Sequence, residues 1–172
     1  MKLNNHRLLL LILLILPFLS GCNQKVKPDG MPDLYPCSIT ITQGGTPLEG
    51  ALVKLEPKQG GTIAWNSDGR TDAKGIAKIA TGIDFNGVPE GEYIVRVSKT
   101  ELSPSELAEY APKNPIEYDK WEKAKRAEKR ITYNLVKPEF NDAKMAPHSI
   151  TITKGKNEAT FDVGEPIKEE IK

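Results

Sequence analysis

This chain of 172 residues contains few of the residues that build disulfides and metal sites. It has two cysteines, Cys22 and Cys37, and two histidines, His6 and His148. Two cysteines form at most one disulfide within a chain, which excludes a disulfide-stapled scaffold. A metal site built mainly from histidine needs more than two of them. We therefore expect a hydrophobic core that folds without metal, cofactor or disulfide.

An excess of one charge sign and long apolar runs are also missing. There are 24 Lys and Arg against 23 Asp and Glu, whereas nucleic-acid-binding domains usually carry a basic surface. The apolar run at residues 8–16 is nine residues long, and a membrane-spanning helix needs about 20. The composition thus predicts neither nucleic-acid binding nor a transmembrane helix.

The first 22 residues have the parts of a secretory signal. Lys2 and Arg7 form a basic start, the apolar run follows, and small residues precede Cys22. The sequence Leu-Ser-Gly-Cys at residues 19–22 resembles the lipobox of bacterial lipoproteins. The resemblance implies a signal peptide at residues 1–21, cleavage before Cys22, and acylation of the Cys22 sulfur and amino group. The alternative is an ordinary secretory signal in which Cys22 is incidental.

Residues 22–36 are predicted to be a lipidated, flexible tether, because they are polar, rich in Pro and Gly, and without periodicity. If Cys22 is lipidated, Cys37 has no partner within the chain. We interpret Cys37 as a small apolar residue packed near the first strand. An intermolecular disulfide or a reactive thiol is the alternative.

Residues 37–163 are predicted to form one mainly β domain, an antiparallel β-sandwich. Short stretches of alternating apolar and polar residues between turn clusters are typical of such folds. In residues 92–98, Tyr93, Val95 and Val97 alternate with Ile94 and Arg96, so the two sets should face opposite sides. The other predicted strands are residues 38–42, 51–56, 69–71, 76–80, 149–153 and 158–163, of which the last two should pair as a hairpin.

A helical excursion is expected at residues 103–130. Ser103, Pro104 and Glu106 have the order of a capping box with Pro at the first helical position. A second, surface helix is predicted at residues 116–130, held mainly by Trp121. Residues 132–147 are expected to be irregular, and residues 164–172 a frayed C-terminal tail.

Three segments resemble a known domain family: residues 50–55 (GALVKL), 69–75 (GRTDAKG) and 88–97 (VPEGEYIVRV). They are similar to the carboxypeptidase regulatory-like, or transthyretin-like, β-sandwich domain, with Asp72 and Gly75 closing a hairpin turn. The closing strands resemble those of lipoproteins that carry this domain. The resemblance implies a β-sandwich that usually serves as a non-enzymatic accessory module, but a fold does not by itself give a function.

Motifs for catalysis and metal binding are incomplete. There is no Gly-x-Ser-x-Gly elbow to accompany His148, which we interpret as a surface residue beside Pro147. Residues 66–69 (NSDG) have some calcium-loop character, but an EF-hand frame places Ala64 and Gly75 where carboxylates are needed. We interpret residues 66–69 as a polar turn and predict no enzyme activity and no cofactor.

Two sets of residues are candidates for binding. Residues 120–130 hold six basic and two acidic side chains. We interpret them as a solvated helix face; contact with anionic headgroups or an envelope polymer is the alternative. Several aromatic residues offer flat faces for sugar stacking; they are Trp65, Tyr93, Tyr110, Tyr118 and Trp121.

The sequence as a whole predicts an exported lipoprotein, held through Cys22 at the outer membrane or cell surface. It would present a non-catalytic domain to an envelope protein or polysaccharide. The alternative function is a carbohydrate or cell-wall-polymer binding module.

Overall fold

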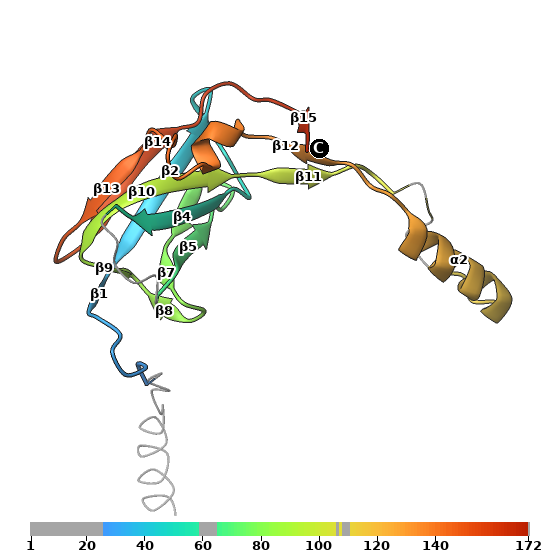
Figure 1. Ribbon diagram of the computed structural model, residues 1–172, viewed down its shortest axis with the longest axis horizontal. Helices are drawn as coiled ribbons and strands as arrows, with labels where there is room; N and C mark the ends of the chain where they lie inside the picture. Colours follow the sequence, from blue (N-terminus) through green and yellow to red (C-terminus); the bar gives the residue numbers. More distant parts are fainter. Residues whose placement is uncertain (1–25, 59–64, 106, 108–110, 172) are drawn as a thin grey trace, which may run out of the picture. The chain divides into compact units, whose positions relative to one another are not determined.

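The computed structural model describes residues 26–58, 65–105, 107 and 111–171 (Figure 1). The chain divides into two compact units, Met1–Met31 and Pro32–Lys172, and the second is mainly β, as predicted. Its elements are β1 Leu34–Tyr35, β2 Cys37–Gln43, β3 Thr46–Pro47, β4 Leu52–Pro57, β5 Ser67–Arg70, β6 Ile76–Lys78, β7 Ala80–Thr81, β8 Phe85–Asn86, β9 Val88–Pro89, β10 Gly91–Ser98, β11 Thr100–Leu102, α2 Pro115–Ala127, β12 Thr132–Asn134, the 3-10 helix η2 Pro138–Asn141, β13 Ser149–Ile152, β14 Asn157–Asp162 and β15 Glu169–Glu170.

Two larger sheets make up the body of the Pro32–Lys172 unit (Figure 1). One has six strands in the order β13-β10-β4-β5-β7-β8, and all neighbours are antiparallel. The other has the order β14-β2-β3, with β6 also paired to β2. Strands β1 and β9 form a two-stranded sheet, and β11, β12 and β15 form a three-stranded one.

The buried faces of the two larger sheets share one hydrophobic core. In β10, Tyr93, Val95 and Val97 are buried, while Ile94 and Arg96 are only half-buried. The predicted alternation of this strand is therefore confirmed. The opposing sheet contributes the buried residues of β2, and β4 contributes those beside β10, so the sheets pack face to face. The buried core residues of these strands are Cys37, Ile39, Ile41, Val53 and Leu55. The core residues that the structure describes all lie within Pro32–Lys172, so this unit has a hydrophobic core of its own.

The last two predicted strands do not pair with each other, so the predicted hairpin is wrong. Strand β13 pairs antiparallel with β10, whereas β14 pairs parallel with β2. The turn between them carries the chain from one sheet to the other. Asn157 holds this crossing, because its side chain accepts from the Thr153 amide at 3.0 Å and donates to the carbonyls of Thr153 and Gly155. One parallel pairing thus stands among the antiparallel ones.

The chain also changes sheets after the turn at Asp72 and Gly75. The Gly75 amide donates to the Asp72 carbonyl at 2.8 Å, as the turn motif predicts. The predicted strand at residues 76–80 is split, because β6 pairs with β2 and β7 pairs with β5. Gly75 is required here: its φ is +74°, and an added Cβ would lie 2.5 Å from the Ile41 carbonyl oxygen.

The helical excursion is confirmed for its second helix. Helix α2 begins after Asn114, whose Oδ1 accepts from the amides of Ile116 and Glu117, and it ends three residues before the predicted end. Residues 103–105 are not helical, and Glu106 lies outside the described residues, as do residues 108–110. None of the described residues of the predicted first helix is helical.

Two further expectations for the C-terminal third are wrong. Residues 132–147 include β12 and η2 and are not irregular throughout. The tail predicted at residues 164–172 contains β15, which pairs with β12 at Tyr133 and Asn134. The sequence pattern did not predict β12 and β15, because strands of two or three residues are too short to show periodicity.

The N-terminal predictions concern residues that the structure describes only in part. Residues 1–21 and Cys22 lie outside the described residues. Leu34 and Tyr35 pair with Pro89 and Val88, so the end of the predicted tether is a strand of the folded unit. Among the described residues, no helix has both the length and the apolar character to cross a membrane.

Candidate functional site

Cys37 is a packed core residue. It lies at the start of β2, is 6% exposed and forms no disulfide. Burial raises the pKa of its thiol to about 11, so the reactive thiolate is scarce near neutral pH. The geometry agrees with the interpretation of Cys37 as a small apolar residue.

His148 is half-buried beside Pro147 and stacks on two aromatic rings. Its ring lies 4.7 Å from that of Phe161 and 5.6 Å from that of Phe140, centroid to centroid. Its Nε2 is 2.9 Å from the carbonyl oxygen of Asp162. These contacts make His148 a packing residue. Within the described part of the chain, His, Cys, Asp and Glu nowhere gather in a group of three that could hold a metal ion.

The segment with calcium-loop character is a strand. Ser67–Arg70 forms β5, so the interpretation of residues 66–69 as a turn is wrong. The Ser67 side chain is buried, and its hydroxyl shares a 2.8 Å hydrogen bond with that of Thr81. Asp68 points instead to the outer face of the sheet, because neighbouring side chains in a strand alternate.

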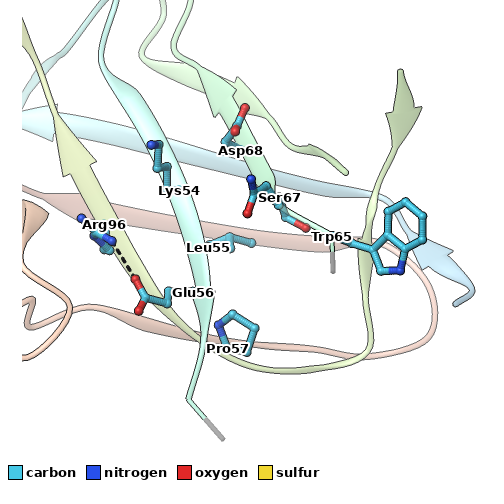
Figure 2. Close-up of a pocket in the computed structure, with 9 residues that line it drawn as sticks. Lys54, Leu55, Glu56, Pro57, Trp65, Ser67, Asp68 and Arg96 are labelled. Atoms are coloured by element: carbon cyan, nitrogen blue, oxygen red, sulfur yellow. Dashed lines mark hydrogen bonds and ion pairs between the residues drawn. The ribbon is translucent and has the colours of Figure 1, made fainter. Parts of the chain in front are cut away.

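A pocket of about 260 Å³ lies on this outer face, over β4, β5 and β10 (Figure 2). Cross-strand register builds it: Arg96 is opposite Lys54, and Lys54 is opposite Asp68. These three side chains form a row across the sheet. Glu56, beside Arg96, and Trp65 also line the pocket. In Figure 2 the indole of Trp65 stands at the opposite end from Arg96. The volume lies below the range of about 300–1,000 Å³ that is usual for drug-sized ligands, which suits a smaller polar group.

Within this row, the Arg96 side chain already has hydrogen-bond partners, whereas those of Lys54 and Asp68 have none in the described part of the chain. Arg96 Nη1 is 2.7 Å from Glu56 Oε2, and Arg96 Nε donates to the Asn141 carbonyl at 2.7 Å. The side chains of Lys54 and Asp68 make no hydrogen bond or ion pair with the described residues. The pocket therefore offers one ammonium donor and one carboxylate acceptor to a ligand. Its two positive and two negative side chains balance, which favours a neutral ligand over a polyanion.

The candidate aromatic residues occupy three separate settings. Tyr93 is buried in the core, and its hydroxyl donates to the Pro89 carbonyl. Tyr118 and Trp121 lie on α2 with ring centroids 6.0 Å apart. Trp65 borders the pocket, and Tyr110 lies outside the described residues. A platform built from the core-facing Tyr93 together with the others is thus excluded.

The pocket could not be predicted from the sequence, because it depends on which residues of neighbouring strands lie opposite one another. Lys54, Asp68 and Arg96 are far apart in the chain, and only the pairing of β10, β4 and β5 brings them into one row. The alternation of β4 was the available signal, since it placed Lys54 and Glu56 on the face opposite the core.

Comparison with known proteins assigns this chain neither a family nor a function. No protein-family model matches the chain, and no curated protein does. The chain is similar to BcpA (D312A), the major pilin subunit of Bacillus cereus, at 15% identity and a TM-score of 0.36, over 83% of this chain and 31% of that one. It is also similar to a proposed adhesin of Bacteroides ovatus, at 15% identity and a TM-score of 0.34, over 89% of this chain and 50% of that one. Similarity at this level assigns no function, and this chain spans half or less of each of those lengths.

Proposed function

We propose that this chain is an exported lipoprotein whose Cys22 anchors it to the outer membrane or cell surface and whose β-sandwich is a non-catalytic binding domain. The observation that carries the proposal is the Leu-Ser-Gly-Cys sequence at residues 19–22, followed by a unit with a hydrophobic core of its own that starts at Pro32. Residues 23–31 separate Cys22 from Pro32, and the ten Cα-to-Cα steps reach at most about 35 Å when extended. Two or three acyl chains would hold the protein stably, because one chain binds a membrane only marginally.

The proposed domain family is that of carboxypeptidase regulatory-like sandwiches. Its support is the position of the motif residues: Asp72 and Gly75 close a turn, and Tyr93, Val95 and Val97 fill the core from β10. The non-catalytic role is supported by the described side chains, in which His148 is packed and Cys37 is buried.

Metabolic labelling with a radioactive fatty acid tests the anchor. The full chain should incorporate label and sediment with membranes, and Cys22→Ala should do neither. Cys37→Ala is the matched control, because it removes the other cysteine and should keep the label. Label that persists in Cys22→Ala contradicts the proposal.

A second candidate function is saccharide binding in the pocket beside Trp65. It is favoured by the unengaged Lys54 and Asp68, which face each other across β4 and β5, and by the charge balance of the lining. Hydroxyl groups of a neutral sugar can accept from the ammonium and donate to the carboxylate. The partner in the envelope would then be a neutral polysaccharide.

Calorimetric titration with fragments of envelope polysaccharides tests this second function. A Lys54→Ala, Asp68→Ala double variant should lose binding by ~10-fold or more, since hydrogen bonds to charged groups contribute about 1.5–3 kcal/mol each. Lys78→Ala is the control, because Lys78 is exposed on β6 in the other sheet. Equal binding by the double variant and the wild type rules out the pocket.

A further inference from the structure

Helix α2 receives no stabilisation from a hydrophobic core. None of its residues is buried. A helix of 13 residues is marginal in water on its own, because most helical stability in proteins comes from packing one face. Its two ends are held: Asn114 caps the first turn, and Arg130 donates from its Nε to the Ser103 carbonyl at 2.7 Å.

One exposed face of α2 carries two lysines. Ile116, Lys120, Lys123 and Ala127 are spaced by four, three and four residues, so they lie along one side of the helix. All four are exposed, and Ile116 is 70% exposed. The side chains of Lys120 and Lys123 make no hydrogen bond or ion pair with the described residues. We call these four residues the basic face.

The segment around α2 carries a net positive charge, to which the helix itself contributes four basic and three acidic side chains. Residues 113–130 contain seven basic and four acidic side chains. The rest of the chain from Cys22 onward contains fifteen basic and nineteen acidic ones. Glu122 is already paired with Arg126 at 2.6 Å. An isolated positive segment on an otherwise negative chain is complementary to an anionic surface.

We propose that the basic face of α2 docks on an anionic lipid bilayer. A bilayer fits better than an acidic polymer because Ile116 stands among the lysines and can enter the boundary between headgroups and acyl chains. The long lysine stems leave their ammonium groups at the phosphates. The small side chain of Ala127 allows the helix to approach the bilayer surface closely. The contact does not depend on acylation of Cys22, and together with an anchor it would fix a second point of the domain at the membrane.

Vesicle sedimentation of residues 32–172 tests the proposal without the anchor. The protein should sediment with phosphatidylcholine vesicles that contain phosphatidylglycerol, and should stay in solution with pure phosphatidylcholine. Binding should weaken as salt is raised. A Lys120→Gln, Lys123→Gln variant should bind about 25-fold more weakly, because each lysine near an anionic surface contributes about a factor of 5. Gln and Lys have similar helix propensities, so α2 itself should be kept.

A matched variant separates the basic face from net charge. Lys144→Gln, Lys154→Gln removes two exposed lysines elsewhere and should bind within about 3-fold of the wild type. Sedimentation with neutral vesicles, no sedimentation with either, or equal loss in both double variants would each overturn the proposal. Equal competition by soluble polyglutamate would show an acidic polymer to be the partner and would overturn it as well. Failure here with normal fatty-acid labelling of Cys22 leaves the proposed anchor standing.

Discussion

The imidazole of His148 stacks on the ring of Phe161, with centroids 4.7 Å apart and planes 25° from parallel. Phe161 belongs to β14, while the carbonyl of His148 accepts from the Val95 amide of β10. The pair therefore joins the edges of the two large sheets at one end of the core. Phe140 of η2 stacks on the same imidazole.

His148→Ala should lower the free energy of unfolding by about 1–2 kcal/mol, because it removes two ring contacts and the contact with the Asp162 carbonyl. Urea denaturation of residues 32–172 measures the change. Ser149→Ala, at the exposed neighbouring position, should change it by less than about 0.5 kcal/mol. Equal effects of the two substitutions would show that the stack contributes nothing.

Gly75→Ala should be much more costly than Gly45→Ala. Both glycines have a positive φ, +74° and +78°, so each substitution carries a backbone cost of about 1–2 kcal/mol. Only at Gly75 would the new Cβ meet backbone, 2.5 Å from the Ile41 carbonyl oxygen, whereas nothing lies within 4 Å at Gly45. The difference in unfolding free energy should be at least about 1–2 kcal/mol. Similar losses would mean that the close approach of the Asp72–Gly75 turn to β2 is wrong.

Arg96→Ala should cost about 1–2 kcal/mol, although its side chain faces outward. The Arg96 side chain is 29% exposed, and its guanidinium is paired with Glu56 and donates to the Asn141 carbonyl. Lys54→Ala, in the next strand of the same row, should cost less than about 0.5 kcal/mol because Lys54 is exposed. A loss at Lys54 equal to that at Arg96 would contradict these contacts.

Acid should weaken the fold partly through Asp162. Its carboxylate accepts from the Thr42 hydroxyl and the Gly45 and Gly164 amides, and the Thr42 bond foremost holds the pKa of Asp162 below its ordinary value of 3.8. A depressed folded-state pKa stabilises the fold above the unfolded value, and this stabilisation is lost as pH falls through the folded pKa. Below about pH 4, thermal midpoints should therefore fall less steeply for Asp162→Asn than for wild type. If the thermal midpoints of the two proteins fall in parallel with pH, Asp162 does not contribute to the loss of stability in acid.

Cys37 should resist alkylation in the folded protein. The thiol is buried, and its pKa is raised to about 11, so iodoacetamide at neutral pH should modify residues 32–172 slowly. In denaturant the same residue should react at the rate of an ordinary thiol. Mass spectrometry over time gives both rates, and comparable rates would show that Cys37 is accessible in the native state.

Several features of this protein could be predicted from the sequence. The alternation in residues 92–98 identified the buried face of β10, because a strand places successive side chains on opposite sides. Asp72 and Gly75 identified their turn, because only certain residues suit a positive φ or a capping carboxylate. The helix near Trp121 was also recognised, although Asn114 was not identified as its cap.

The tertiary structure alone decided which strands are neighbours. Local alternation does not distinguish a hairpin from two strands in different sheets, so β13 and β14 were expected to pair. Likewise, Arg96, Lys54 and Asp68 form one row only through the register of three strands. The ring contacts of His148 depend on the positions of η2 and β14, which supply Phe140 and Phe161. Contacts between residues far apart in sequence depend on the whole arrangement of sheets, which periodicity and turn chemistry do not encode.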